Sequence, residues 1–145
     1  MNKVLIKKLS ARAFLPHYQT RGSSGCDLHA VVDGSVTIMP GAVSLIKTGI
    51  SIAMPQGYEA QVRSRSGLAL KYGVFVLNSP GTVDNDYRGE VCVILCNVGE
   101  SAFVVEDGMR IAQMVFCKYE QLIFTEVETL DDTDRGDGGF GSTNL

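Results

Sequence analysis

Residues 44–62 read Ser-Leu-Ile-Lys-Thr-Gly-Ile-Ser-Ile-Ala-Met-Pro-Gln-Gly-Tyr-Glu-Ala-Gln-Val, and this stretch carries the pattern that decides the fold. Apolar runs at 44–54 and 58–62 have the composition and spacing of strands. Pro55-Gln56-Gly57 separates them, and Pro and Gly are typical of turns. The stretch therefore predicts strands joined by a turn.

The same pattern recurs along most of the chain. Further strand-like runs occupy 4–6, 25–30, 35–38, 73–77, 91–96, 102–105 and 111–118. Turn signals such as Asp33-Gly34, Pro40-Gly41 and Pro80-Gly81 separate them at short intervals. One helical turn is expected over 66–72, with Ser66 as its N-cap. These features predict an all-β chain with one short helix, as a sandwich, jelly roll or compact β-barrel.

Length and charge exclude several classes of protein. The chain has 145 residues, which suits one domain with a real core. Its net charge of −3 argues against a protein that coats nucleic acid, because such a protein needs a dominant basic face. The run at 91–96 is too short to cross a membrane, and residues 1–15 contain no run typical of a signal sequence. We expect a cytoplasmic protein without a membrane partner.

Cysteine and histidine usage gives no sign of a metal cluster. The chain has four cysteines without CxxC spacing: Cys26, Cys92, Cys96 and Cys117. Three of them, Cys92, Cys96 and Cys117, lie in apolar strand-like runs, which predicts buried free thiols rather than disulfides or zinc ligands. His17 and His29 are too few for a histidine-rich metal site.

A candidate phosphate cradle is Arg63-Ser64-Arg65-Ser66-Gly67, where a strand meets the short helix. Two guanidiniums, two hydroxyls and a glycine adjoin a helix N-terminus, whose free N–H groups favour anions. The alternative is a capped helix with surface arginines. Weaker polar candidates are Asp27, Arg110 and Gln113, for which an exposed charge or an ordinary ion pair is the alternative.

A second candidate is the polar segment 77–90, expected to form a long hairpin between two apolar strands. Its backbone groups and the amide of Asn78 can match the edge of a pyrimidine. Asp84 can act as a general base toward water, and Tyr87 can pack against a sugar and exclude an extra hydroxyl. The alternative is an ordinary acidic turn.

The C-terminal segment 135–143 combines one cation, four glycines, one aromatic ring and two hydroxyls. Glycines let backbone N–H groups approach an anion, Arg135 can pair with phosphate, and Phe140 can stack on a flat ring. Its G-x-G-x-x-G match is rejected because too few residues follow to form a helix. The alternative is a disordered tail.

Taken in order, five segments resemble the motifs of the trimeric dUTPase family. They are Gly25-x-Asp27-Leu28-x-Ala30, Arg65-Ser66-Gly67-Leu68-Ala69, Asn78 with Val83-Asp84-x-Asp86-Tyr87-Arg88-Gly89-Glu90, Arg110-Ile111-Ala112-Gln113, and Arg135-Gly136-x-Gly138-Gly139-Phe140-Gly141-Ser142-Thr143. Five ordered motifs are far more specific than any one of them. Cys26, Ser64 and the final Asn144-Leu145 depart from the common pattern, which puts local packing in question more than activity.

The resemblance implies a β-barrel or jelly-roll subunit in a homotrimer, with each active site assembled from three chains. Residues 1–125 would form the domain, and 126–145 an acidic linker and glycine-rich tail that closes a neighbour's site. The implied reaction is hydrolysis of dUTP to dUMP and pyrophosphate by attack of water on the α-phosphorus. It limits uracil incorporation into DNA and supplies dUMP. Mg²⁺ would be chelated mainly by the triphosphate.

The same resemblance implies a role for each motif residue. Asp84 would be the general base, and Tyr87 would lie beneath the deoxyribose. Uracil would contact Asn78, Thr82, Val83 and Cys92. Phosphates would be held by Arg65, Ser66, Gly67 and Gln113, with Asp27 near the water shell of the metal. The tail positions that close over the substrate would be Arg135, Phe140, Gly141 and Ser142, with Phe140 stacked on uracil.

Two other functions are compatible with this fold. A dCTP deaminase binds a similar nucleotide but attacks the pyrimidine ring, and that family lacks the combined hairpin and tail patterns seen here. A non-catalytic nucleotide-binding module would have no need to keep Asp84.

Overall fold

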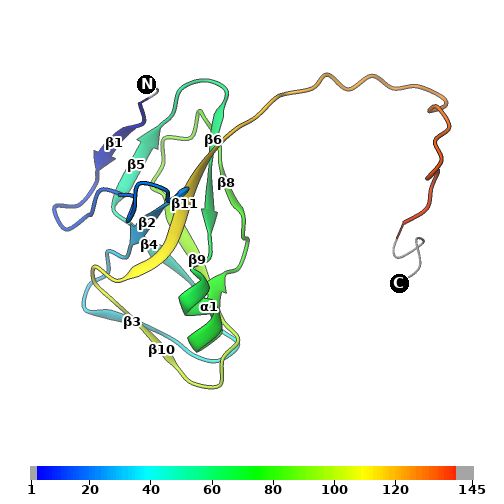
Figure 1. Ribbon diagram of the computed structural model, residues 1–145. Coiled ribbons are helices and arrows are strands. Elements are labelled where there is room, and N and C mark those ends of the chain that lie inside the picture. Colours follow the sequence, from blue (N-terminus) through cyan, green and yellow to red (C-terminus); the bar gives the residue numbers. More distant parts are fainter. Residues whose placement is uncertain (1–2, 140–145) are drawn as a thin grey trace.

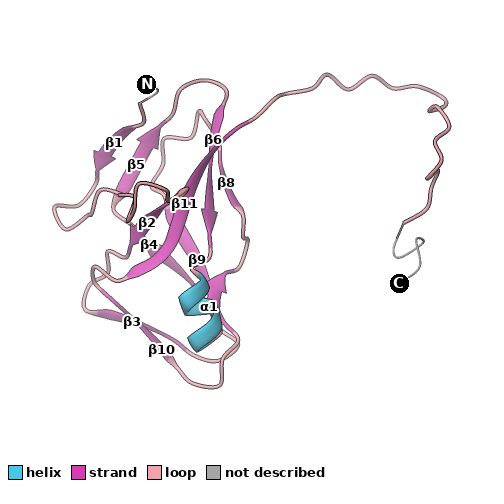
Figure 2. Cartoon of the chain, in the orientation of Figure 1, coloured by secondary structure: helices cyan, strands magenta, loops and turns pink. Residues whose placement is uncertain are grey.

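The structure is a computed structural model that describes residues 3–139, and its regular elements are strands except for one short helix (Figure 2). The strands are β1 (Leu5–Lys8), β2 (Gly25–His29), β3 (Ser35–Ile38), β4 (Val43–Lys47), β5 (Ile50–Ala53), β6 (Tyr58–Arg63), β7 (Val74–Val76), β8 (Gly81–Val83), β9 (Cys92–Asn97), β10 (Phe103–Glu106) and β11 (Arg110–Lys118). The helix is α1 (Ser66–Tyr72). The predicted mostly β architecture with one short helix is confirmed.

The strands pair in four antiparallel sheets. One sheet has the order β2-β11-β6-β8 and a second the order β4-β9-β7, while β1 pairs with β5 and β3 with β10. In Figure 1 the β3–β10 pair lies at the bottom of the body and the β1–β5 pair at the upper left. Within the described residues, the hydrogen bonds do not join these sheets into one closed barrel.

Two local predictions are wrong. The expected single run at 44–54 is two strands, because Gly49 has a φ of 69° and turns the chain between β4 and β5. The N-cap of α1 is Arg65 rather than Ser66, and it makes no side-chain cap. The segment expected as a hairpin also contains a short strand, β8, paired with β6.

Aliphatic side chains from all four sheets form one core. Leu28 of β2, Ile38 of β3, Ile50 of β5 and Leu95 of β9 are each buried. Burial of a side chain of this size stabilises the fold by about 1.5–3 kcal/mol. Asn97 is also buried, and its Nδ2 donates to Ile38 O at 2.8 Å and ties β9 to β3. This core fixes the strands whose ends carry the site.

The four cysteines are free, as predicted. Cys26 and Cys96 are buried, whereas Cys92 and Cys117 are half-buried, so burial was predicted for more of them than the structure shows. No helix among residues 3–139 is long and apolar enough to span a membrane.

The segment after β11 leaves the body of the protein. Residues 119–139 contain no helix or strand and extend far from the sheets (Figure 1). Several large apolar side chains of this segment are exposed, by 57% to 96%: Leu122, Ile123, Phe124, Val127 and Leu130. Covering these apolar side chains with another surface would stabilise the protein, because burial removes them from water.

His29, at the end of β2, is packed in a ring stack. Its centroid lies 4.7 Å from that of Phe14 and 6.2 Å from that of His17. Its buried Nδ1 has no hydrogen-bond partner in the described part of the chain. Burial lowers the pKa of His29 below its ordinary value of 6.5 and outweighs the opposite effect of Asp27. The folded protein therefore holds this ring neutral more strongly than the unfolded chain does.

Stability is consequently expected to fall as the pH drops below 6.5, the ordinary pKa of histidine. In that window the unfolded chain binds more protons at His29 than the folded chain, so protonation favours unfolding. His29→Phe keeps an aromatic ring in the stack and removes the titration. Melting temperatures of both proteins between about pH 7 and pH 5 should show a shallower decline for the variant. Parallel curves would contradict this origin of the pH dependence.

Candidate active site

The hairpin between β7 and β9 encloses a cavity of about 340 Å³. All six of the hairpin positions predicted to contact a nucleotide line it: Asn78, Thr82, Val83, Asp84, Tyr87 and Cys92. Leu45, Val62 and Ile94 add apolar side chains to the wall. The sequence analysis missed these three, since they come from other strands and carry only an ordinary core pattern. We name this space the hairpin cavity.

Hydrogen bonds fix the loop that carries Asp84. Asn85 Nδ2 donates to the carbonyls of Met54 at 2.9 Å and Pro55 at 2.7 Å, which fastens the loop to the end of β5. The Tyr87 hydroxyl donates to Glu90 O at 3.0 Å. These hydrogen bonds position the loop without using the Asp84 side chain, so its exposed carboxylate remains available to other groups.

Glu90 ties the hairpin to the turn between β4 and β5. Its Oε1 accepts from the backbone N–H of Gly49 at 2.8 Å. Nearby, burial raises the pKa of the Cys92 thiol, and Glu90 raises it further. Cys92 therefore stays neutral at physiological pH and presents a weakly polar wall to the cavity.

A second, smaller cavity of about 180 Å³ lies at the start of α1. It is lined by all five residues predicted for the phosphates and the metal's water shell: Asp27, Arg65, Ser66, Gly67 and Gln113. The strand register explains their meeting, because Gln113 of β11 stands opposite Asp27 of β2 on one side and Arg63 of β6 on the other. We name this space the phosphate cradle.

Two cations converge on the carboxylate of Asp27. Arg110 Nη1 lies 3.2 Å from its Oδ2, and Arg65 Nε lies 3.5 Å from its Oδ1. Arg65 Nη1 also donates to Arg110 O at 2.9 Å. Asp27 is only 8% exposed, so it is not a solvent-facing charge. It organises the positive groups of the phosphate cradle.

Gln113 owes its position to a glycine. A Cβ at residue 25 would collide with the Gln113 amide oxygen, so this close approach requires Gly25. Gln113 Nε2 donates to Ser64 O at 3.0 Å, which links β11 to the chain entering α1. The side chain thus stands at the edge of the phosphate cradle with its carbonyl oxygen turned to β2.

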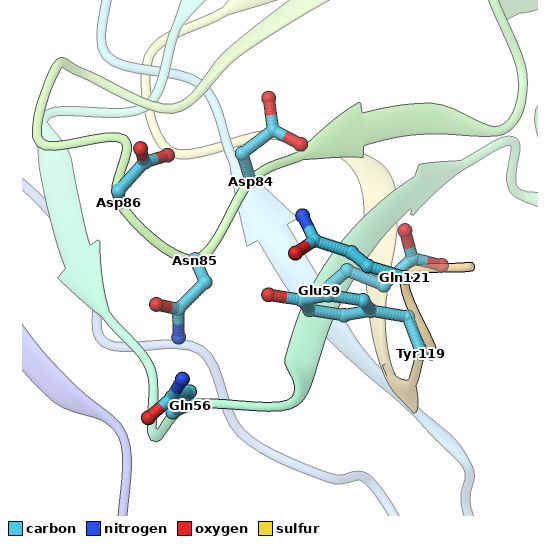
Figure 3. A pocket seen from close by; sticks show the side chains of 7 residues that line it. All are labelled: Gln56, Glu59, Asp84, Asn85, Asp86, Tyr119 and Gln121. Carbon is cyan, nitrogen blue, oxygen red and sulfur yellow. The ribbon is translucent and has the colours of Figure 1, made fainter. Parts of the chain in front are cut away.

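A third cavity, of about 600 Å³, adjoins the hairpin cavity through Asp84 (Figure 3). Figure 3 shows Asp84 and Asp86 on one wall, with Glu59 of β6 and Tyr119 beyond β11 on the other. Three carboxylates line this space, and like charges disfavour a polyphosphate there. Its volume alone does not make it a nucleotide site.

The hairpin cavity and the phosphate cradle share no lining residue. Arg135 lines neither, and its Nε donates to Gly138 O at 2.9 Å in a turn far along the C-terminal segment. Phe140, Gly141 and Ser142 lie outside the described residues. Among residues 3–139, the residues predicted to contact the base and those predicted to contact the phosphates therefore line two separate cavities.

Comparisons with known proteins find similarity to dUTPases in both sequence and structure. The dUTPase family model matches residues 11–144. A deoxyuridine 5'-triphosphate nucleotidohydrolase of Chlamydia muridarum is 60% identical over 137 residues, which is 94% of either chain. The solved dUTPase of Staphylococcus bacteriophage 80alpha with dUPNHPP has a TM-score of 0.91 at 24% identity and covers 100% of both chains.

A second solved structure concerns a metal. It is a mutant dUTPase from phage phi11 of S. aureus, described for the coordination of a structural Mg(II) ion, with a TM-score of 0.81 at 20% identity. The match covers 90% of this chain and 100% of the phage chain. At these identities the two structural likenesses show the fold.

Proposed function

This chain belongs to the dUTPase family, and from that premise we propose that it hydrolyses dUTP to dUMP and pyrophosphate by attack of water on the α-phosphorus. The observation that carries the proposal is the meeting of Asn78, Asp84 and Tyr87 around one cavity beside strand β8. Such a reaction keeps uracil out of DNA and supplies dUMP.

The hairpin cavity suits a deoxyuridine nucleotide for two physical reasons. Strand β8 is at the edge of its sheet, so its outer backbone groups remain available to pair with the edge of uracil. Tyr87 is anchored through its hydroxyl, so its ring can support the deoxyribose and leave no room for a 2′-hydroxyl. Asn78, Thr82, Val83 and Cys92 complete the base contacts in this proposal.

Asp84 acts as the general base. Its carboxylate makes no hydrogen bond or ion pair with another side chain among residues 3–139, so both oxygens can orient a water molecule. The water loses a proton to Asp84 as its oxygen attacks phosphorus, and pyrophosphate leaves on the opposite side.

The phosphate cradle holds the triphosphate through Arg65, Ser66, Gly67 and Gln113. No three His, Cys, Asp or Glu side chains of the described chain converge as a metal site. Mg²⁺ therefore fits as an ion carried by the triphosphate, where it offsets the negative charge. Asp27, which lines the cradle, would contact its water shell.

We further propose that three jelly-roll chains assemble and share their active sites. The separate hairpin cavity and phosphate cradle support this arrangement, because each is half of a nucleotide site. The exposed apolar side chains between Leu122 and Leu130 also support it, because a neighbouring chain would cover them. Residues 126–145 then reach a neighbour's site, where Arg135 and Gly141-Ser142 close over the phosphates and Phe140 stacks on uracil.

The test is incubation of the full chain with dUTP or dCTP and Mg²⁺, with pyrophosphate and ammonia followed separately. We expect pyrophosphate from dUTP and no ammonia from either nucleotide. Ammonia without pyrophosphate would instead identify a deaminase. Binding of dUTP with neither product would identify a non-catalytic module.

A further inference from the structure

The shortest hydrogen bond to the cradle carboxylate comes from a residue outside every recognised motif. Gln19 Nε2 donates to Asp27 Oδ2 at 2.7 Å, closer than Arg110 at 3.2 Å on the same oxygen. Arg65 meets the other oxygen, Oδ1, at 3.5 Å. Gln19 therefore makes the closest contact that sets the rotation of this carboxylate.

The Gln19 amide is held in one orientation. Its Nε2 also lies 2.8 Å from His17 Nε2. An amide nitrogen only donates, so its two hydrogens go to Asp27 and to the imidazole nitrogen of His17. Flipping the amide would place its oxygen against Asp27 Oδ2, where two acceptors repel each other and the hydrogen bond to Asp27 is lost. The ring of His17 is in turn stacked on His29.

The loop does not depend on the Gln19 side chain for its path. The backbone N–H of Asp27 donates to His17 O at 3.2 Å, which fastens the loop to β2. Thr20 and Ser23 are joined through their hydroxyls at 2.9 Å. Removing the Gln19 amide therefore leaves the loop attached while freeing one side of the Asp27 carboxylate.

We propose that Gln19 is a positioning residue of the phosphate cradle. By holding Asp27 Oδ2 together with Arg110, it keeps Oδ1 turned to Arg65 and so fixes the guanidinium that receives the triphosphate. This inference rests on the proposed function, because it assigns Gln19 to the phosphate part of the same substrate. The hairpin cavity, which receives the base, has no contact with Gln19 in this arrangement.

The experiment compares two ligands on the full chain with Mg²⁺. One is the imido analogue dUpNHpp, which carries three phosphates and resists hydrolysis, and the other is dUMP, which lacks the outer two. For Gln19→Ala we expect calorimetry to show about tenfold weaker binding of the analogue and an affinity for dUMP within about twofold of the parent.

Two further variants sharpen the comparison. Gln19→Glu keeps the shape but sets a second carboxylate against Asp27, so its loss of analogue affinity should exceed that of Gln19→Ala. Ser24→Ala alters an exposed residue of the same loop, and it should bind both ligands like the parent. Equal losses for both ligands would show that Gln19 only supports the loop. Unchanged affinity for the analogue would equally overturn the inference.

The outcome is separable from that of the proposed function. Pyrophosphate release from dUTP is measured on the parent protein, whereas the role of Gln19 is measured by binding of an analogue that is not turned over. A parent that binds dUpNHpp but releases no pyrophosphate would refute the activity alone. A parent that hydrolyses dUTP, with a Gln19→Ala variant that binds the analogue normally, would refute the positioning role alone.

Discussion

Replacing Asp84 with asparagine is expected to lower kcat by about 10²- to 10⁴-fold while dUTP binding stays nearly intact. Asparagine keeps the shape of the side chain and one carbonyl oxygen, but it cannot take a proton from water. The anchors of the loop, Asn85 on Met54 and Tyr87 on Glu90, do not use the replaced group. Pyrophosphate release gives kcat, and calorimetry with dUpNHpp gives the affinity.

The matched control for this variant is Glu59→Gln. Glu59 lines the acidic cavity together with Asp84 but does not line the hairpin cavity (Figure 3). The Glu59→Gln substitution removes one negative charge near Asp84, as Asp84→Asn does, but it changes no residue that lines the hairpin cavity. Similar losses in both variants would mean that local charge, and not proton transfer, controls turnover. Undiminished turnover of Asp84→Asn would remove Asp84 from the role of base.

Local patterns predicted the strands well because strand periodicity is a property of neighbouring residues. The run expected at 35–38 is β3, and those at 58–62 and 111–118 became β6 and β11 with one more residue each. The break at Gly49 was not predicted. Its turn is held by Glu90, which is distant in sequence and approaches only in the folded chain.

The hairpin cavity could be predicted from local sequence, whereas the full lining of the phosphate cradle could not. The hairpin residues lie within one short segment, so their meeting around a cavity follows from the hairpin itself. The phosphate cradle depends on the register of β2, β11 and β6, which brings together Asp27, Gln113 and Arg65 from three parts of the chain. From the sequence, only the family resemblance predicted that these three residues act together. The role of Gln19 could not be predicted from the sequence, because its hydrogen bond to Asp27 becomes visible only once the side chains are placed in the fold.

Deleting residues 135–145 is expected to lower kcat/KM by about 10²-fold or more and to leave the assembly unchanged. The deletion removes Arg135, the glycines and Phe140, the groups proposed to close over a bound nucleotide and exclude water. The body should remain folded, because its last strand ends at Lys118, and the apolar side chains at 122–130 are retained. Activity and sedimentation are measured on the same sample. A shift to monomer would count against the tail being a lid.

Mixing two inactive variants decides whether the tail acts on its own chain or on a neighbour. The truncated chain keeps Asp84 but has no tail, and the full-length Asp84→Asn chain keeps the tail but has no base. If tails cross between subunits, mixed assemblies contain sites with Asp84 from one chain and the tail from another, so activity should return after subunit exchange. If each tail closes over its own chain, every site still lacks one of the two, and the mixture stays as inactive as its parts.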